Sequence, residues 1–148
     1  MVTALNQIVR KNSTEHLFLS AGILPTQIEA AINEASGVMV DVLKNQLENG
    51  KALDLMSFFK GIKSNRTLIT SMMVKKYTNR LTQYYHVSEI AAYQLAIAII
   101  PSTVEQFVSQ TDDQQKSDNG FIQLLNWLSG NTVNFENFFL RTNQFQLA

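Results

Sequence analysis

The chain has 148 residues, which suits one domain with a single hydrophobic core. Apolar residues make up 45% and charged residues only 16%, unlike a disordered chain, which is rich in charge and poor in aromatic residues. The formal net charge is zero, so no overall field attracts nucleic acid or an anionic membrane. There is no cysteine, which excludes disulfides, thiol nucleophiles and thiolate metal sites.

The small number of Pro and Gly residues and the spacing of the apolar residues predict an all-α fold. Only two Pro and six Gly interrupt it, and apolar residues recur at three- and four-residue steps rather than alternating. The first ten residues lack the basic start and long apolar run of a signal peptide. We therefore predict a single helical domain over residues 1–148, a compact bundle of about six to eight helices of ordinary length.

The first half of the chain carries several helix boundary signals. Thr26 and Glu29 are spaced as a capping box after Pro25, so a long amphipathic helix is expected from Ile28. Asn49-Gly50 is expected to end it in a left-handed turn. The other helices expected before residue 86 cover residues 2–11, 14–19 and 53–60, and Ser64 or Asn65 to about Tyr85.

The stretch 87–100 is apolar nearly all round and is expected to be the central, buried helix of the bundle. Ser88 is its expected cap. The apolar run within it is too short for a membrane span, which needs about 20 residues. Pro101 lacks an amide hydrogen, so the helix is expected to kink or break there, with a second segment over 102–110. Beyond it we expect a polar loop over 111–120, a helix to Leu128 and a short helix over 135–140.

No motif for catalysis, metal or cofactor binding is present. His16 and His86 have no partners at metal-ligand or catalytic-motif spacing, and the acidic residues after Thr111 do not fit a calcium loop. No nucleophile elbow or phosphate loop occurs. We therefore expect a non-enzymatic protein without a cofactor. An enzyme would need residues that only the fold assembles, such as His86 with Glu89 and Tyr85.

Charge is unevenly distributed along the neutral chain. Residues 51–80 hold seven basic side chains against Asp54 alone, a net charge of +6. This pattern is compatible with a patch for nucleic acid or an acidic partner. The overall neutrality and the lack of a single helical stripe argue against nucleic acid, and acidic segments elsewhere can neutralise the patch. The candidate residues are Lys60, Lys63, Arg66, Lys75, Lys76 and Arg80.

Two further sets of residues are candidates for binding. Four aromatic side chains near the C-terminus either close the core or dock a partner or a second copy of the chain. They are Phe135, Phe138, Phe139 and Phe145. Helical bundles also host apolar ligands between their helices. The expected lining of such a pocket is Met72, Met73, Tyr77, Tyr93 and Phe107.

Three pieces of the chain together resemble the YidB-like bacterial proteins, in the variant common in Bacteroidota. They are the amphipathic helix ending in Leu-Glu-Asn-Gly-Lys (47–51), Val-Ser-Glu-Ile-Ala-Ala (87–92) leading into Ala-Ile-Ile-Pro (98–101), and Gly-Phe-Ile-Gln-Leu-Leu (120–125) closing with Leu-Ser-Gly (128–130). The resemblance implies a helical, cytoplasmic bacterial domain of unknown function, with no catalytic residues to transfer.

These observations favour a helical module that acts through protein contacts, with a protein partner or with a second copy of itself. The alternative is a protein that binds a small apolar ligand in a pocket between helices. Neither expectation involves a membrane span.

Overall fold

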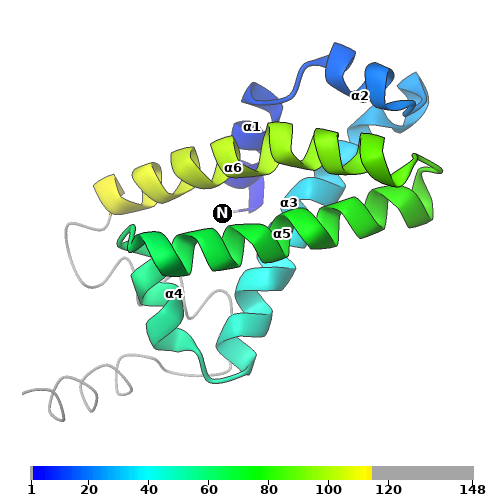
Figure 1. Cartoon of the computed structure of the whole chain (residues 1–148). Helices are drawn as coiled ribbons and strands as arrows, with labels where there is room; N and C mark the ends of the chain where they lie inside the picture. Colours follow the sequence, from blue (N-terminus) through cyan, green and yellow to red (C-terminus); the bar gives the residue numbers. More distant parts are fainter. Residues whose placement is uncertain (1, 115–148) are drawn as a thin grey trace, which may run out of the picture.

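The computed structural model describes residues 2–114, with the backbone alone described for 2–4 and 111–114. This part of the chain is all-α, as predicted, and contains six α-helices, one 3-10 helix and no strand (Figure 1). The helices are α1 (Val2–Lys11), α2 (Glu15–Ala21), η1 (Pro25–Gln27), α3 (Ile28–Glu48), α4 (Ala52–Phe59), α5 (Lys63–Tyr84) and α6 (Glu89–Gln114).

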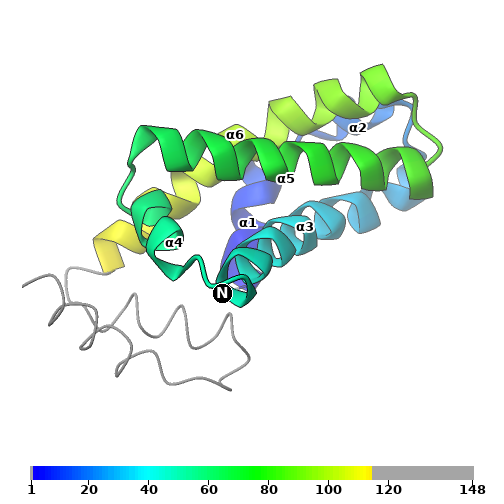
Figure 2. The same ribbon diagram turned by 60° about the horizontal axis from the view of Figure 1, so that its bottom comes forward.

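The bundle is built around an antiparallel hairpin of α5 and α6. These two helices lie side by side and are joined by a short link (Figures 1 and 2). α3 packs against α5, and α1 packs against both α3 and α6. α2 covers the first turns of α6, and α4 contacts α3, α5 and α6. The α5–α6 hairpin therefore contacts the other helices on one side and leaves another side open.

The caps of α2 and α4 follow the sequence signals. The Thr14 hydroxyl accepts a hydrogen bond from the Leu17 amide, and Gly22 ends α2 with φ +95°. Gly61 follows α4 with φ +81°, a backbone conformation that favours glycine. The helices expected over 2–11, 14–19 and 53–60 are confirmed to within two residues.

The capping box predicted for α3 is wrong. Residues 25–27 form a 3-10 turn that leads into the helix, and the residue that caps α3, Gln27, makes no capping hydrogen bond with its side chain. Pro25 fixes φ at the first position of that turn, so the chain begins to wind before Thr26 could act as a cap. The far end is as predicted, with Gly50 at φ +76°.

The break predicted at Pro101 is also wrong, because α6 runs without interruption through this residue. A proline inside a helix costs about 3 kcal/mol. Each large apolar side chain that is buried on either side of it contributes about 1.5–3 kcal/mol. Ile99 and Ile100 before it and Val104 and Phe107 after it are all buried. Packing of both halves in the core therefore outweighs the cost of the proline.

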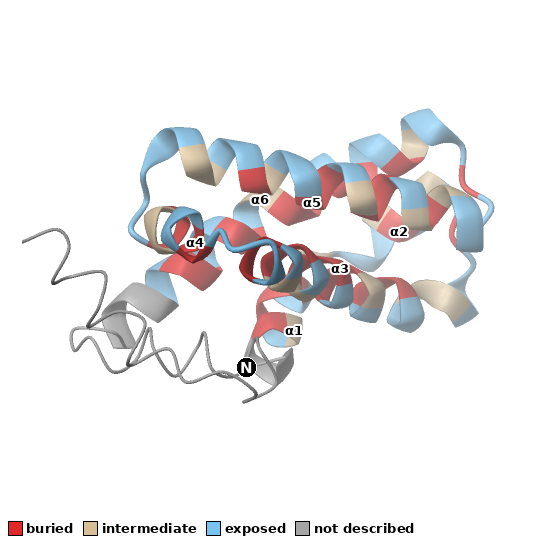
Figure 3. Cartoon of the chain, turned by 90° about the horizontal axis from the view of Figure 1, so that it is seen from below, coloured by how far each residue is buried: buried red, intermediate tan, exposed pale blue. Residues whose placement is uncertain are grey.

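α6 is central in its contacts but is not buried all round as expected. Its buried side chains lie on one face, at the three- and four-residue spacing of an amphipathic helix. On another face Ile90, Tyr93 and Ile97 are exposed. Figure 3 shows the alternation of buried and exposed residues along the helices of the bundle.

Residues 111–114, expected in the polar loop, are helical, because α6 extends to Gln114. The remainder of that loop, the helix expected to Leu128 and the short helix over 135–140 lie outside the described residues.

Candidate functional site

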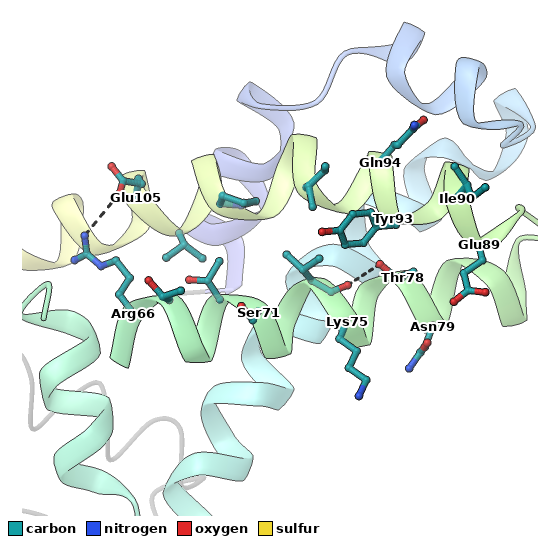
Figure 4. A pocket seen from close by; sticks show the side chains of 16 residues that line it. Arg66, Ser71, Lys75, Thr78, Asn79, Glu89, Ile90, Tyr93, Gln94 and Glu105 are labelled. Carbon is teal, nitrogen blue, oxygen red and sulfur yellow. Dashed lines mark hydrogen bonds and ion pairs between the residues drawn. The ribbon is translucent and has the colours of Figure 1, made fainter. Parts of the chain in front are cut away.

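An open groove of about 970 Å³ lies between α5 and α6 (Figure 4). It runs along much of the hairpin and is lined by side chains from these two helices alone. The lining residues of α5 are Arg66, Thr67, Thr70, Ser71, Val74, Lys75, Thr78 and Asn79, and those of α6 are Glu89, Ile90, Tyr93, Gln94, Ile97, Pro101, Val104 and Glu105.

The α6 wall of the groove carries an exposed apolar stripe. Ile90, Tyr93 and Ile97 follow one another at three- and four-residue steps, which places them on one helical face. Their exposed fractions are 74%, 52% and 45%. Tyr93 extends from α6 into the space between the two helices (Figure 4). Pro101 and the buried Val104 continue the same face along the groove.

The α5 wall consists of small polar side chains. Thr67, Thr70, Ser71 and Thr78 line it. The hydroxyl of Thr78 donates a hydrogen bond to the Val74 carbonyl at 2.8 Å, so its hydrogen-bonding capacity is used within its own helix. The remaining lining residues of α5 are Arg66, Val74, Lys75 and Asn79.

Charged groups lie at the ends of the groove rather than along its middle. At one end the Arg66 guanidinium lies 3.9 Å from the Glu105 carboxylate. At the other end lie Glu89 and Asn79 (Figure 4). Lys75 borders the middle, but its side chain points away from α6 (Figure 4). The centre of the groove is therefore apolar on one wall and uncharged on the other.

Pro101 gives the α6 wall one unusual polar group. The Ile97 carbonyl would receive the amide hydrogen of residue 101 in an ordinary helix, and proline has none. Ile97 and Pro101 both line the groove. A donor that reaches the Ile97 carbonyl from the groove would supply the hydrogen bond that Pro101 cannot.

The fold divides the predicted basic patch. Arg66, Lys76 and Arg80 lie within 4 Å of acidic side chains on other helices, namely Glu105 at 3.9 Å, Asp41 at 3.8 Å and Glu34 at 3.7 Å, respectively. Lys60, Lys63 and Lys75 make no ion pair within the described residues. Lys60 follows the end of α4, whereas Lys63 and Lys75 are on α5. Three of the six predicted residues are therefore paired with acidic groups and three are not, and the patch stays a prediction.

The residues predicted to line a ligand pocket do not surround a common cavity. Met73, Tyr77 and Phe107 are core side chains, whereas Tyr93 is on the wall of the groove. Met72 is partly exposed, and its sulfur accepts a hydrogen bond from the Gln46 amide at 3.7 Å. Three of the five side chains therefore fill the core and only Tyr93 lines the groove, so the pocket formed by all five stays a prediction.

Tyr77 is the one buried titratable side chain with a strongly shifted pKa in the described part of the chain. Its hydroxyl donates a hydrogen bond to the Ala31 carbonyl at 2.8 Å. Burial, with smaller effects of Tyr85 and Glu34, raises its pKa far above the usual value. It thus stays protonated as a structural group that joins α5 to α3.

The structure does not assemble the residues considered for catalysis. No hydrogen bond or ion pair links His86 with Glu89 or Tyr85 within residues 2–114. His86 instead occupies the left-handed turn that follows α5, with φ +54°. In the same part of the chain no group of three or more His, Cys, Asp and Glu side chains could hold a metal ion. No helix described there is long and apolar enough to cross a membrane.

The predicted aromatic docking residues Phe135, Phe138, Phe139 and Phe145 lie outside the described residues. The groove itself was missed from the sequence, since a helix that is apolar all round is expected to be buried all round. One feature of the sequence could have indicated the groove. Gln94 interrupts the apolar run, and the facing helix carries a stripe of small hydroxyl residues instead of large apolar ones.

The fold and the groove define an all-α bundle with one open helical hairpin. Comparisons of the chain with protein-family models, with curated proteins and with solved structures found no match. The resemblance to the YidB-like proteins therefore stays a prediction from the sequence.

Proposed function

We propose that the chain is a non-enzymatic protein-interaction module whose α5–α6 groove binds an amphipathic helix of a partner protein. The observation that carries the proposal is the exposed apolar stripe of Ile90, Tyr93 and Ile97 beside a wall of small side chains. Contiguous exposed apolar surface of this kind marks interaction sites on soluble proteins. An amphipathic helix laid in an apolar groove is a common mode of peptide recognition.

The length of the groove suits a helical partner. From Ile90 to Val104 the α6 wall covers 14 helical steps, or about 21 Å at 1.5 Å per residue. A helix of about four turns has the same length. Small residues on α5 let such a helix approach the backbone closely, as small residues do at packed helix interfaces.

The walls of the groove define the chemistry of the partner. Its apolar face would pack on Ile90, Tyr93 and Ile97, and charge at the middle of that face would be desolvated without a counter-ion. A side-chain donor opposite the Ile97 carbonyl would gain a hydrogen bond worth about 0.5–1.5 kcal/mol. We infer a neutral, apolar helical segment with one amide, hydroxyl or indole donor. From the resemblance to the YidB-like proteins we infer that this interaction takes place in the bacterial cytoplasm.

The proposal can be tested by selecting helical peptides from a display library against the full chain and measuring their affinities. Ile97→Asp should weaken binding by about tenfold or more, because it places a charge in the apolar stripe. Tyr93→Asp should act in the same direction. Leu24→Asp is the matched control, since Leu24 is 59% exposed but lies between α2 and α3, outside the groove.

Circular dichroism would show that each variant remains folded, which is expected because all three side chains are exposed. Selected peptides that bind Ile97→Asp as tightly as the unchanged chain would overturn the proposal. So would a library that yields no helical peptide at all.

A further inference from the structure

We propose that residues 121–128 of the same chain occupy the half of the groove nearest the C-terminal end of α6, as an intramolecular competitor of the partner. This inference rests on the proposed function of the groove. It concerns the regulation of that site, and it follows from the groove's position, the sequence of 121–128 and the length of chain between them.

The sequence Phe-Ile-Gln-Leu-Leu-Asn-Trp-Leu at 121–128 has the chemistry that the groove requires. Six of its eight residues are large and apolar, and none is charged. At 100° per residue, Gln123 and Asn126 fall together on one side of a helix, and the apolar residues cover the rest. Gly120 before it and Gly130 after it suit helix boundaries. A helix with so wide an apolar face needs a surface to cover it.

The connection is long enough to bring this segment back to the groove. The near end of the groove lies at Glu105, nine helical steps before the end of α6 at Gln114, or about 14 Å. The six residues 115–120 can span up to about 20 Å when extended. The segment can therefore return to the level of Glu105 and run antiparallel to α6.

This arrangement sets a register. Eight helical residues extend about 12 Å, which is the length of α6 from Glu105 back to Ile97. Phe121 would then lie near Val104, and Trp127 would lie near Ile97. Ile90 and Tyr93, at the far end of the groove, would stay accessible to a partner.

Covalent connection favours this occupant over a second copy. A short flexible link gives the attached segment an effective concentration in the millimolar range, well above typical concentrations of a separate chain. A partner helix would have to displace the segment, and its apparent affinity would be lowered by the fraction of grooves already filled.

Two features of the composition make the test direct. Trp127 is the only tryptophan, so fluorescence on excitation at the indole band reports on this segment alone. The chain has no cysteine, so a single introduced thiol can be labelled uniquely. The full chain is used throughout.

In the unchanged chain, Trp127 emission should be blue-shifted, poorly quenched by acrylamide and independent of protein concentration. Ile97→Asp should shift the emission to the red and increase quenching, whereas Leu24→Asp should do neither. A nitroxide attached at Ile97→Cys should quench Trp127 strongly, and the same label at Leu24→Cys should not. Unchanged emission in Ile97→Asp, or equal quenching by the two labels, would overturn the inference. Emission that shifts with protein concentration would overturn it in favour of a second copy.

A second arm separates this inference from the proposed function. Leu125→Asp with Leu128→Asp should release the segment and raise the affinity for selected peptides by about tenfold or more. Unchanged peptide affinity in this variant would contradict competition. Failure of all peptides to bind even this released variant, with Trp127 of the otherwise unchanged chain responding to Ile97→Asp, would leave the intramolecular contact established and the partner site disproved. Peptide binding without any response of Trp127 would establish the partner site and disprove the intramolecular contact.

Discussion

Tyr77 shows how a single residue can join two helices in this core. Its ring is completely buried on α5, and its hydroxyl reaches the Ala31 carbonyl on α3. The sequence placed Tyr77 correctly on the apolar side of its helix but could not reveal the hydrogen bond, because Ala31 lies 46 residues away. Burial of the hydroxyl raises the pKa of Tyr77, since a phenolate has no compensation there.

Tyr77→Phe should lower the free energy of unfolding by about 1 kcal/mol at neutral pH, the usual contribution of one hydrogen bond. The substitution should also change how the free energy of unfolding depends on pH. The folded pKa lies above the unfolded value of about 10, so the contribution of Tyr77 is fully present below pH 10. It is lost as the pH rises further, by about 1.4 kcal/mol per unit. Urea unfolding between pH 8 and pH 12 would measure this, and the stability difference between the two chains should shrink above about pH 10 and change sign before pH 12. Tyr84→Phe, at an exposed position, should change neither value.

Gly37 lies within α3, where glycine is an unfavourable residue. The structure shows an exposed position in the middle of α3, and no neighbouring atom lies within 4 Å of the place that a β-carbon would take. No packing reason for glycine exists there. The cost of a flexible residue inside the helix is therefore not offset by any contact.

Gly37→Ala should raise the free energy of unfolding by about 0.5–1 kcal/mol, because alanine loses less conformational freedom on folding. Thermal or urea unfolding would measure the difference. Gly50→Ala is the matched control. Space is available at that position too, but φ is +76°, so the substitution should destabilise the chain. Equal effects of the two substitutions would contradict this account.

At the scale of the helices, local signals predicted where most elements lie. Gly22, Gly50 and Gly61 end three helices in left-handed turns, and the Ser88 hydroxyl accepts a hydrogen bond from the Ala91 amide at the start of α6. These signals act within four residues and are therefore readable from the sequence. The continuity of α6 through Pro101 and the exposure of its second face depend on neighbouring helices, so the local pattern predicted both incorrectly.

Pro101→Ala tests the two consequences of a proline inside α6. Restoring the amide hydrogen and removing the clash with the preceding turn should raise the free energy of unfolding by up to about 3 kcal/mol. The same substitution satisfies the Ile97 carbonyl within the helix. Groove-binding peptides that use this acceptor should then bind about fivefold more weakly, as loss of one hydrogen bond implies. Urea unfolding and peptide titration would measure the two effects separately. A gain in stability with unchanged peptide affinity would show that the carbonyl is not used.

On the scale of the whole molecule, the charge pattern is an example of what a sequence cannot show. Residues 51–80 carry a net charge of +6, yet α3 lies beside α5 and presents Asp41 to Lys76 and Glu34 to Arg80. Pairing between helices far apart in the chain turns a basic segment into a mixed surface. The groove likewise cannot be read from the sequence, because it forms only when α5 and α6 lie side by side.

If the acidic residues of α3 neutralise the basic side of α5, removing them should create an anion-binding surface. Glu34→Gln with Asp41→Asn should elute from a heparin column at higher salt than the unchanged chain, which should not be retained at about 0.15 M salt, where screening is strong. Glu15→Gln with Glu48→Gln is the matched control. It changes the net charge equally, but at exposed residues that make no ion pair within the described part of the chain. Equal retention of the two double variants would mean that net charge alone governs binding. Stronger retention of the α3 variant would show that the position of the acidic residues in the fold suppresses binding of polyanions.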